Sequence, residues 1–76
     1  MANTEDIRQA YEEAEQKHRT AYRRAIWLEH RLFSAPTEEE YNAISAELEK
    51  QETELRTLAR EATLARLCYT RACMMS

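Results

Sequence analysis

The sequence predicts an all-α protein, an antiparallel two-helix coiled-coil hairpin that dimerises into a four-helix bundle. Three observations lead to this fold class: the chain is 76 residues long, it contains no glycine and one proline, and its apolar residues recur at helical spacing. Folds built from many strands need turn residues at short intervals, and this chain offers them at one place. A domain this small buries only about 60% of its unfolded surface, so we expect a homodimer or another partner.

The first helix is predicted over about residues 4–33. Its apolar side chains alternate in steps of three and four, which is the heptad spacing of a coiled coil. The a and d positions of this seam are Ile7, Tyr11, Ala14, His18, Ala21, Ala25, Leu28 and Leu32. Asn3 is placed to cap the helix, with Asp6 as its reciprocal partner.

The second helix is predicted over about residues 37–73, after a turn at about 34–36. Its seam positions are Tyr41, Ile44, Leu48, Gln51, Leu55, Leu58, Ala62, Ala65, Tyr69 and Ala72. Thr37 followed by Glu40 forms a capping box, and Pro36 disfavours helix in the residue before it. Because the turn is short, the helices must run antiparallel as neighbours, and residues 1–76 form a single helical-hairpin domain.

The charges beside the seam select one register. In an antiparallel pair the g positions of the two helices face each other. The g pairs are Arg31 with Glu40, Arg24 with Glu47, and Lys17 with Glu54. The same register sets Ala25 near Leu48, Ala14 near Leu58, and Tyr11 near Ala62 on the seam. Each exposed ion pair adds little stability, so these charges fix the register more than they stabilise the hairpin.

Two groups of large apolar residues lie off the seam, about 25 Å apart along the hairpin. Exposed apolar patches of this kind mark binding sites. Near the loop we predict a partner-binding cluster of Tyr22, Arg23, Ile26, Trp27, His30 and Phe33. Near the termini we predict a dimer interface of Leu64, Leu67, Cys68 and Met74, with Met75 beside it.

Two placements of these patches remain open. In the first, a two-fold antiparallel dimer sets the Trp27 patch of one chain against the Leu64–Leu67 patch of the other. In the second, one patch makes the dimer and the other meets a foreign protein. Trp27 is accordingly either a core residue of the bundle or the anchor for a foreign partner. A third use of the patches is head-to-tail assembly.

No catalytic, cofactor-binding or metal site is predicted, and no cofactor. The carboxylates occupy helix caps and edges, and the chain has neither a nucleophile–base arrangement nor a glycine-rich phosphate loop. His18 is expected to be a polar seam residue hydrogen-bonded to Gln51 or Tyr22, with a pH-sensitive or metal-binding role as the alternative. Cys68 and Cys73 fall on different helix faces, so we expect free thiols and no zinc site.

The chain is expected to be cytoplasmic, because it has free thiols and neither a signal peptide nor a membrane segment. Nucleic acid and membranes are not the expected partners. A basic run around Tyr22 nevertheless makes an RNA-binding hairpin dimer the alternative function. Its cations would be Arg19, Arg23, Arg56 and Arg60. The acidic stretch over residues 38–54 lies beside this run and repels phosphate.

The heptads, together with the segments NTEDIRQAYEEAE and APTEEEYNAI, resemble two groups of helical hairpins. The first is the small phage-encoded host-takeover proteins of the anti-quorum-sensing type. That resemblance implies a dimer that blocks a host regulator or motor ATPase. The second is the plasmid repressor-of-primer family, which implies an antiparallel dimer that binds paired RNA loops. Neither resemblance assigns binding residues here. We therefore expect a non-enzymatic regulator or inhibitor that occludes a host or cellular protein.

Overall fold

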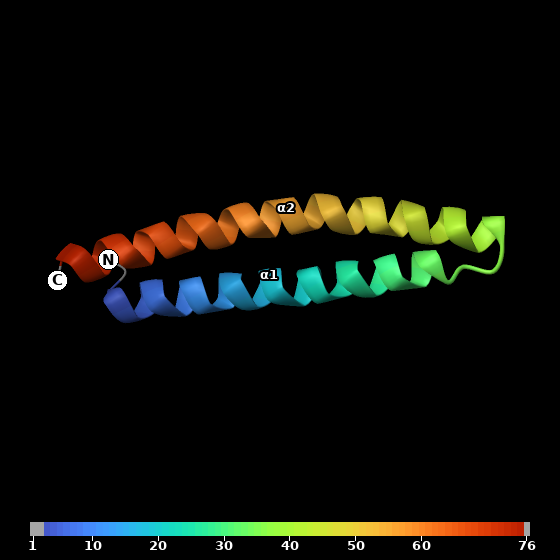
Figure 1. Ribbon diagram of the computed structural model, residues 1–76. Helices are drawn as coiled ribbons and strands as arrows, with labels where there is room; N and C mark the ends of the chain where they lie inside the picture. Colours follow the sequence, from blue (N-terminus) through green and yellow to red (C-terminus); the bar gives the residue numbers. More distant parts are fainter. Residues whose placement is uncertain (1–2, 76) are drawn as a thin grey trace.

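The protein is a hairpin of two long helices in a computed structural model that describes residues 3–75. Helix α1 spans Thr4–Phe33 and helix α2 spans Glu38–Met75, and they run antiparallel with both chain ends at one end (Figure 1). The molecule measures 57 × 16 × 14 Å. The predicted hairpin is therefore confirmed. Helix α2 begins one residue later than expected and continues two residues further.

Both helices begin at the predicted caps. The Asn3 side-chain oxygen accepts a hydrogen bond from the Asp6 backbone N–H at 2.9 Å. The Thr37 hydroxyl oxygen likewise accepts one from the Glu40 N–H at 3.1 Å, so Thr37 stands just outside α2. Within residues 3–75, the Asp6 and Glu40 carboxylates accept no hydrogen bond from the backbone N–H of the capping residue. Each helix start therefore has one of the two hydrogen bonds of a capping box. Acidic residues fill the first turn of each helix and favour the positive end of its dipole.

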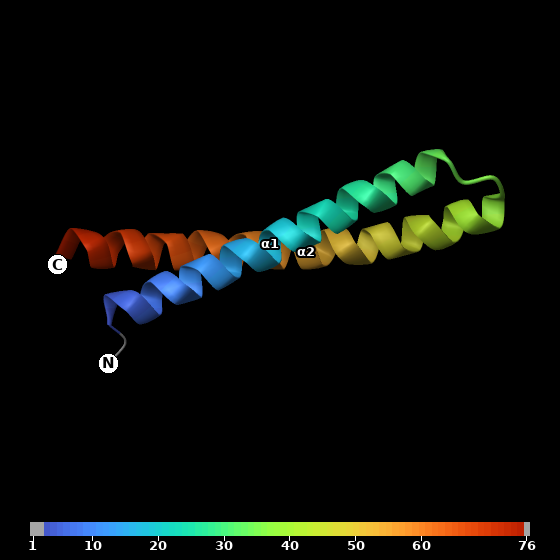
Figure 2. The same cartoon turned by 90° about the horizontal axis from the view of Figure 1, so that it is seen from below.

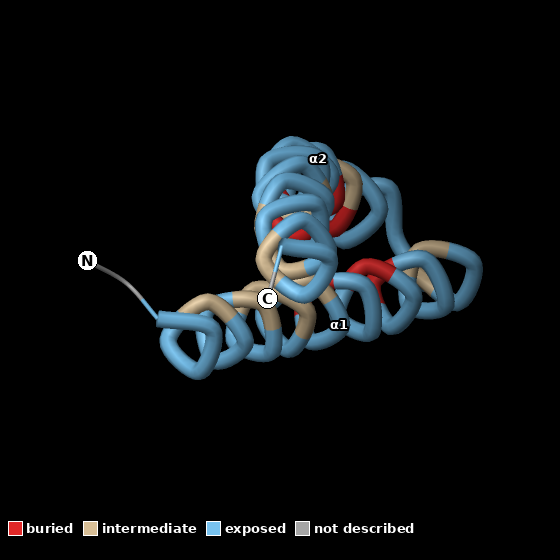
Figure 3. Tube along the Cα trace, turned by 90° about the vertical axis from the view of Figure 1, so that its left-hand side faces the viewer, coloured by how far each residue is buried: buried red, intermediate tan, exposed pale blue. Residues whose placement is uncertain are grey.

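The buried side chains lie along the predicted seam. All of them face the other helix, and both outer sides of the hairpin are exposed (Figure 3). They are Ala21, Ala25, Leu28, Ile44, Leu48, Gln51 and Ala62. Leu28, which is 1% exposed, packs in one cluster with Ala25, Ile44 and Leu48, as the register predicts.

The two helices cross at a shallow angle, so each end of α1 lies to a different side of α2 (Figure 2). The small side chains Ala21 and Ala25 allow close approach between the helices. Tyr41 lies near the loop, in the first turn of α2, and it is exposed whereas the other seam residues are buried or half-buried. Toward the chain ends, the Tyr11 ring of α1 stacks on the Tyr69 ring of α2.

The register did not predict one seam contact. Tyr11 stacks on Tyr69, with ring centroids 5.4 Å apart and planes 8° from parallel. Helical side chains lean toward the N-terminus of their own helix. In an antiparallel pair, Tyr11 therefore leans toward the chain ends while Tyr69 leans toward the loop. The two rings meet although their backbone positions are offset along the hairpin.

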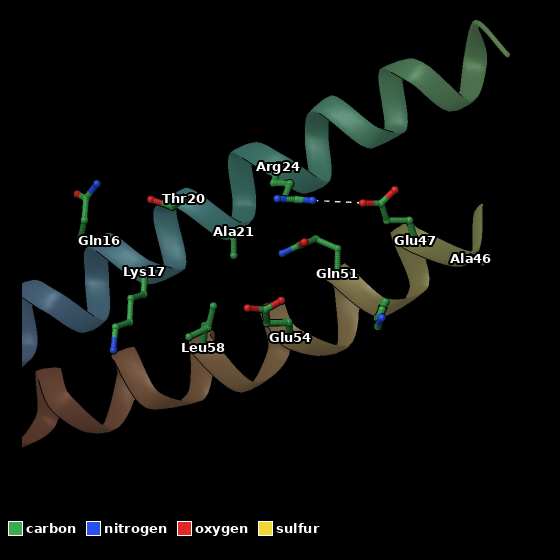
Figure 4. A pocket seen from close by; sticks show the side chains of 11 residues that line it. Gln16, Lys17, Thr20, Ala21, Arg24, Ala46, Glu47, Gln51, Glu54 and Leu58 are labelled. Atoms are coloured by element: carbon green, nitrogen blue, oxygen red, sulfur yellow. Dashed lines mark hydrogen bonds and ion pairs between the residues drawn. The ribbon is translucent and has the colours of Figure 1, made fainter. Parts of the chain in front are cut away.

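One of the three predicted g pairs is an ion pair between the helices. Arg24 contacts Glu47 at 3.2 Å (Figure 4). Lys17 and Glu54 line the same groove but form no ion pair within residues 3–75. The Arg31 guanidinium lies 5.0 Å from the centre of the Trp27 ring, and no ion pair joins Arg31 to Glu40 in that part of the chain. An exposed arginine gains as much from an aromatic face as from a carboxylate.

Candidate interaction surfaces

One side of the hairpin is hollowed by a groove of about 880 Å³ between the helices (Figure 4). Its floor is made by small or apolar residues, including Ala21 and Leu58, and charged side chains form its rim. The residues that line it are Gln16, Lys17, Thr20, Ala21, Arg24, Ala46, Glu47, Lys50, Gln51, Glu54 and Leu58. Most of the rim occupies g and c positions of the heptads. We call the side of the hairpin formed by these positions the groove face.

Trp27 belongs to the groove face. A smaller pocket of about 230 Å³ lies at the loop end, where Trp27 and His30 line it together with Ile44 of α2. The g residues Arg31 and Glu40 line the same pocket, which places it on the side of the g edge. Trp27 is 55% exposed, and one face of its ring is covered by the Arg31 guanidinium.

Tyr22, Ile26 and Phe33 lie on the other side, which we call the opposite face. They occupy e and b positions, and none of them lines either pocket. Ile26 and Phe33 are seven residues apart and so share one side of α1, whereas Trp27 is turned about 100° from Ile26. Phe33 is 91% exposed. Arg23 stands at an f position on the outer ridge of α1.

The structure therefore divides the predicted partner-binding cluster into two groups. Trp27 and His30 line the loop-end pocket, while Tyr22, Ile26 and Phe33 form a separate exposed surface. These residues were predicted as one cluster because all of them lie off the seam near the loop. The heptad positions alone contain the signal that separates them, because b and c positions point to different sides of a helix.

The predicted dimer residues are divided in the same way. Leu64 and Cys68 occupy c and g positions of α2 and lie on the groove face, beyond its central groove. Leu67 and Met74 occupy f positions on the outer ridge of α2. All four are exposed in the single chain.

A polar cluster that sequence reasoning missed surrounds Tyr69 at the chain ends. A hydrogen bond with Cys73 raises the pKa of Tyr69 above its usual value, and a charge interaction with Cys73 and partial burial act in the same direction. Arg8 forms ion pairs with Glu5 and with Glu12, the latter at 3.5 Å. The hydrogen bond and the charge of Glu5 raise the pKa of Arg8, so this cation keeps its charge.

His18 does not make the hydrogen bond expected of it. Its ring lies beside Tyr22, with centroids 6.4 Å apart and planes inclined by 31°, and within residues 3–75 no hydrogen bond links it to Tyr22 or Gln51. Gln51 points from α2 toward α1 above the groove floor (Figure 4). In residues 3–75 no group of three or more metal-binding side chains is found, and Cys68 and Cys73 form no disulfide.

The chain exposes more surface than a compact protein of the same mass. Its accessible area is 6208 Å² for 9.0 kDa. A compact monomer of that mass exposes about 4,900 Å². The difference is larger than the roughly 800 Å² that each partner buries in a standard protein interface.

Comparisons with known proteins gave no match. No protein-family model, curated protein or solved structure matched this chain. Within residues 3–75, neither helix contains an apolar stretch long enough to cross a bilayer. The function is therefore inferred from the hairpin and its two faces.

Proposed function

We propose that this protein is a non-enzymatic regulator, a homodimeric hairpin that binds a host or cellular protein and inhibits it by occlusion. The observation that supports this most directly is the exposed group of Tyr22, Ile26 and Phe33 on one face of α1. The hairpin does not use these side chains in its own core. Large apolar and aromatic residues outside the core are typical of interface anchors.

The proposed mechanism is docking of α1 into a groove of the partner. Ile26 and Phe33 would enter the groove as two anchors spaced by two helical turns, with Tyr22 as a third. Arg23, on the adjoining ridge, would orient the complex from the rim. A hairpin bound in that groove would block the binding of the partner's own ligand or second subunit. Such an inhibitor needs no catalytic group.

The test compares two matched double variants of the tagged protein. Ile26→Ser/Phe33→Ser removes the anchors, while Leu67→Ser/Met74→Ser makes an equal apolar-to-polar change on the outer ridge of α2. Proteins retained from source cells are quantified by mass spectrometry. We expect one protein that wild type and the ridge variant retain equally and the anchor variant retains at least tenfold less. Equal retention by all three proteins would contradict the proposal.

Self-association is the second element of the proposal, and the excess accessible area supports it. Light scattering over a hundredfold concentration range tests it directly. A dimer mass that persists across the range is expected. A monomer mass at every concentration would refute self-association and would leave both faces to foreign partners.

The alternative function is RNA binding by the hairpin dimer. Arg19 and Arg56 occupy b positions on the opposite face, and Arg23 and Arg60 occupy f positions on the outer ridges. Carboxylates at neighbouring positions of both helices weaken the attraction of this surface for phosphate. A gel shift with total RNA at low salt distinguishes the functions: no shift is expected, and a salt-sensitive shift lost in Arg19→Ala/Arg56→Ala would favour RNA.

A further inference from the structure

We propose that two copies join through their groove faces, antiparallel to each other, with α1 packed on α1 and α2 on α2. This inference rests on the proposed self-association and assigns its surface and register. In the first placement considered from the sequence, Trp27 met Leu64 and Leu67. Here Trp27 packs on α1 of the second copy instead.

The groove face of each helix has the spacing of a second coiled-coil seam. Its g and c positions alternate in steps of three and four, from Asp6 to Arg31 on α1 and from Glu40 to Met75 on α2. The two pockets show that residues at these positions share one side of the hairpin. A helix with two seams on adjacent sides is suited to a four-helix bundle, because it contacts two neighbours.

On α1, one antiparallel register matches three of the four pairs of groove-face positions by size or charge, and the fourth pair sets Lys17 opposite Thr20. It places Trp27 over Ala10 of the second copy, where a small side chain leaves room for the indole. It pairs Arg24 with the second copy's Glu13. It also pairs Arg31 with the second copy's Asp6. By the two-fold symmetry each of these contacts occurs twice.

On α2, the same two-fold axis gives a second set of matches. Lys50 meets Glu61 of the second copy, and Glu40 meets the second copy's Arg71. Ala43 meets Cys68, which is a contact between two small apolar groups. Glu47 opposite Leu64 is the one unfavourable contact, and Glu47 already has Arg24 as its partner. The two-fold axis implied by the α1 contacts and the axis implied by the α2 contacts both pass near His18. The two helices therefore support the same arrangement independently.

Shifted registers lose the fit of the large apolar side chains. Moving the register by one heptad toward the loop sets Trp27 against Lys17 and Leu64 against Glu40. Moving it by one heptad toward the chain ends keeps opposite charges together, but it sets Leu64 against Glu54 and leaves Trp27 opposite Asn3, outside α1. Antiparallel pairing of the opposite face sets Ile26 against Arg8 or Glu15, and sets Glu29 against another glutamate. Like charges and buried ions cost free energy at an interface, so the groove face is favoured as the contact between copies.

The groove face also has the area that a stable dimer needs. A face 57 Å long and 16 Å wide measures about 900 Å² per copy, compared with about 800 Å² per partner in a standard interface. Joining the groove faces leaves Tyr22, Ile26 and Phe33 outside, once on each subunit. The dimer therefore presents two equivalent partner sites on its two outer sides.

The test is a charge swap between Lys50 and Glu61. Lys50→Glu places two acids together at both symmetric contacts, and Glu61→Lys places two bases together there. We expect each variant alone to raise the dimer dissociation constant at least tenfold, as measured by sedimentation. Mixing the two variants should restore a heterodimer, and the double variant should dimerise as wild type does. Matched controls on the opposite face are Arg56→Glu and Glu49→Lys, which should dimerise normally.

Each outcome decides a separate point. A monomeric wild type refutes the proposed self-association, and this inference with it. A dimeric wild type whose Lys50→Glu variant dimerises normally overturns the groove face as the interface. Weakened single variants that do not recover on mixing overturn the antiparallel register, because with parallel hairpins Lys50 would face α1 of the second copy. Circular dichroism confirms that each variant remains helical.

Discussion

Tyr11 of α1 and Tyr69 of α2 stack face to face, with their ring centroids 5.4 Å apart, and close the open end of the hairpin. The middle of the hairpin is held by alanines and aliphatic residues. At the chain ends the helices have no loop to restrain them, so we expect this stack to reduce fraying there. It links residues nearly 60 positions apart in the sequence.

We expect the two tyrosines to be energetically coupled. In a double-mutant cycle with Tyr11→Ala and Tyr69→Ala, the coupling in the free energy of unfolding should be about 0.5–1.5 kcal/mol. Urea titrations followed by circular dichroism measure it. A parallel cycle that combines Tyr11→Ala with Tyr41→Ala, at opposite ends of the hairpin, should give a coupling near zero. Equal coupling in both cycles would mean that the stack has no specific role.

The raised pKa of Tyr69 predicts how stability changes at alkaline pH. The hydrogen bond with Cys73 is the main cause of the raised pKa and favours the neutral phenol in the folded chain. A group whose pKa is raised by folding stabilises the protein below its unfolded pKa, near 10 for tyrosine. That stability should be lost as the pH rises through the pKa of the folded state.

Carbon NMR of tyrosine-labelled protein measures this effect at one residue. Titration of the Tyr69 ring should move to lower pH in Cys73→Ala, which cannot form the hydrogen bond. Cys68→Ala removes the other thiol and keeps Cys73, so it is the matched control and should leave the Tyr69 titration unchanged. An unchanged Tyr69 titration would show that Cys73 does not govern its pKa.

The elements fixed by local sequence could be predicted, and the seam is the clearest case. Helix caps depend on residues three apart, as Asn3 and Asp6 show, and heptad spacing determines which face is buried. Leu28 and Leu48 therefore lie where the spacing places them. The contact between Tyr11 and Tyr69 could not be predicted, because it depends on how far two side chains lean along a crossed pair of helices.

The structure separates two residues that the predicted cluster joined. Trp27 and Ile26 both lie off the seam near the loop, yet Trp27 lines a pocket on the groove face and Ile26 does not. Lying off the seam does not place two residues on one face, because adjacent helical residues point about 100° apart. The groove itself was not foreseen, since its depth follows from the small residues on its floor and the crossing of the helices.

Leu28 should be the residue most sensitive to truncation. It is the most deeply buried large side chain within residues 3–75, and it packs in one cluster with Ala25 of α1 and with Ile44 and Leu48 of α2. Leu28→Ala should lower the free energy of unfolding by about 2–4 kcal/mol. Leu67→Ala removes the same atoms from a side chain that is 57% exposed. That control should change stability by about 0.5 kcal/mol or less, and comparable losses in the two variants would contradict the assigned core.

Gln51 is the one polar residue among the buried seam positions, and replacing it should stabilise the hairpin. Gln51→Leu extends the aliphatic seam from Leu48 toward Leu55, and the amide it removes makes no hydrogen bond within residues 3–75. We expect the free energy of unfolding to rise by about 1 kcal/mol, as expected for added apolar burial. Gln9→Leu, on the exposed outer ridge of α1, makes the same change without burial and should leave stability within about 0.5 kcal/mol. A loss of stability in Gln51→Leu would show that the amide supports the fold through contacts absent from the single chain, such as those of a second copy across the groove.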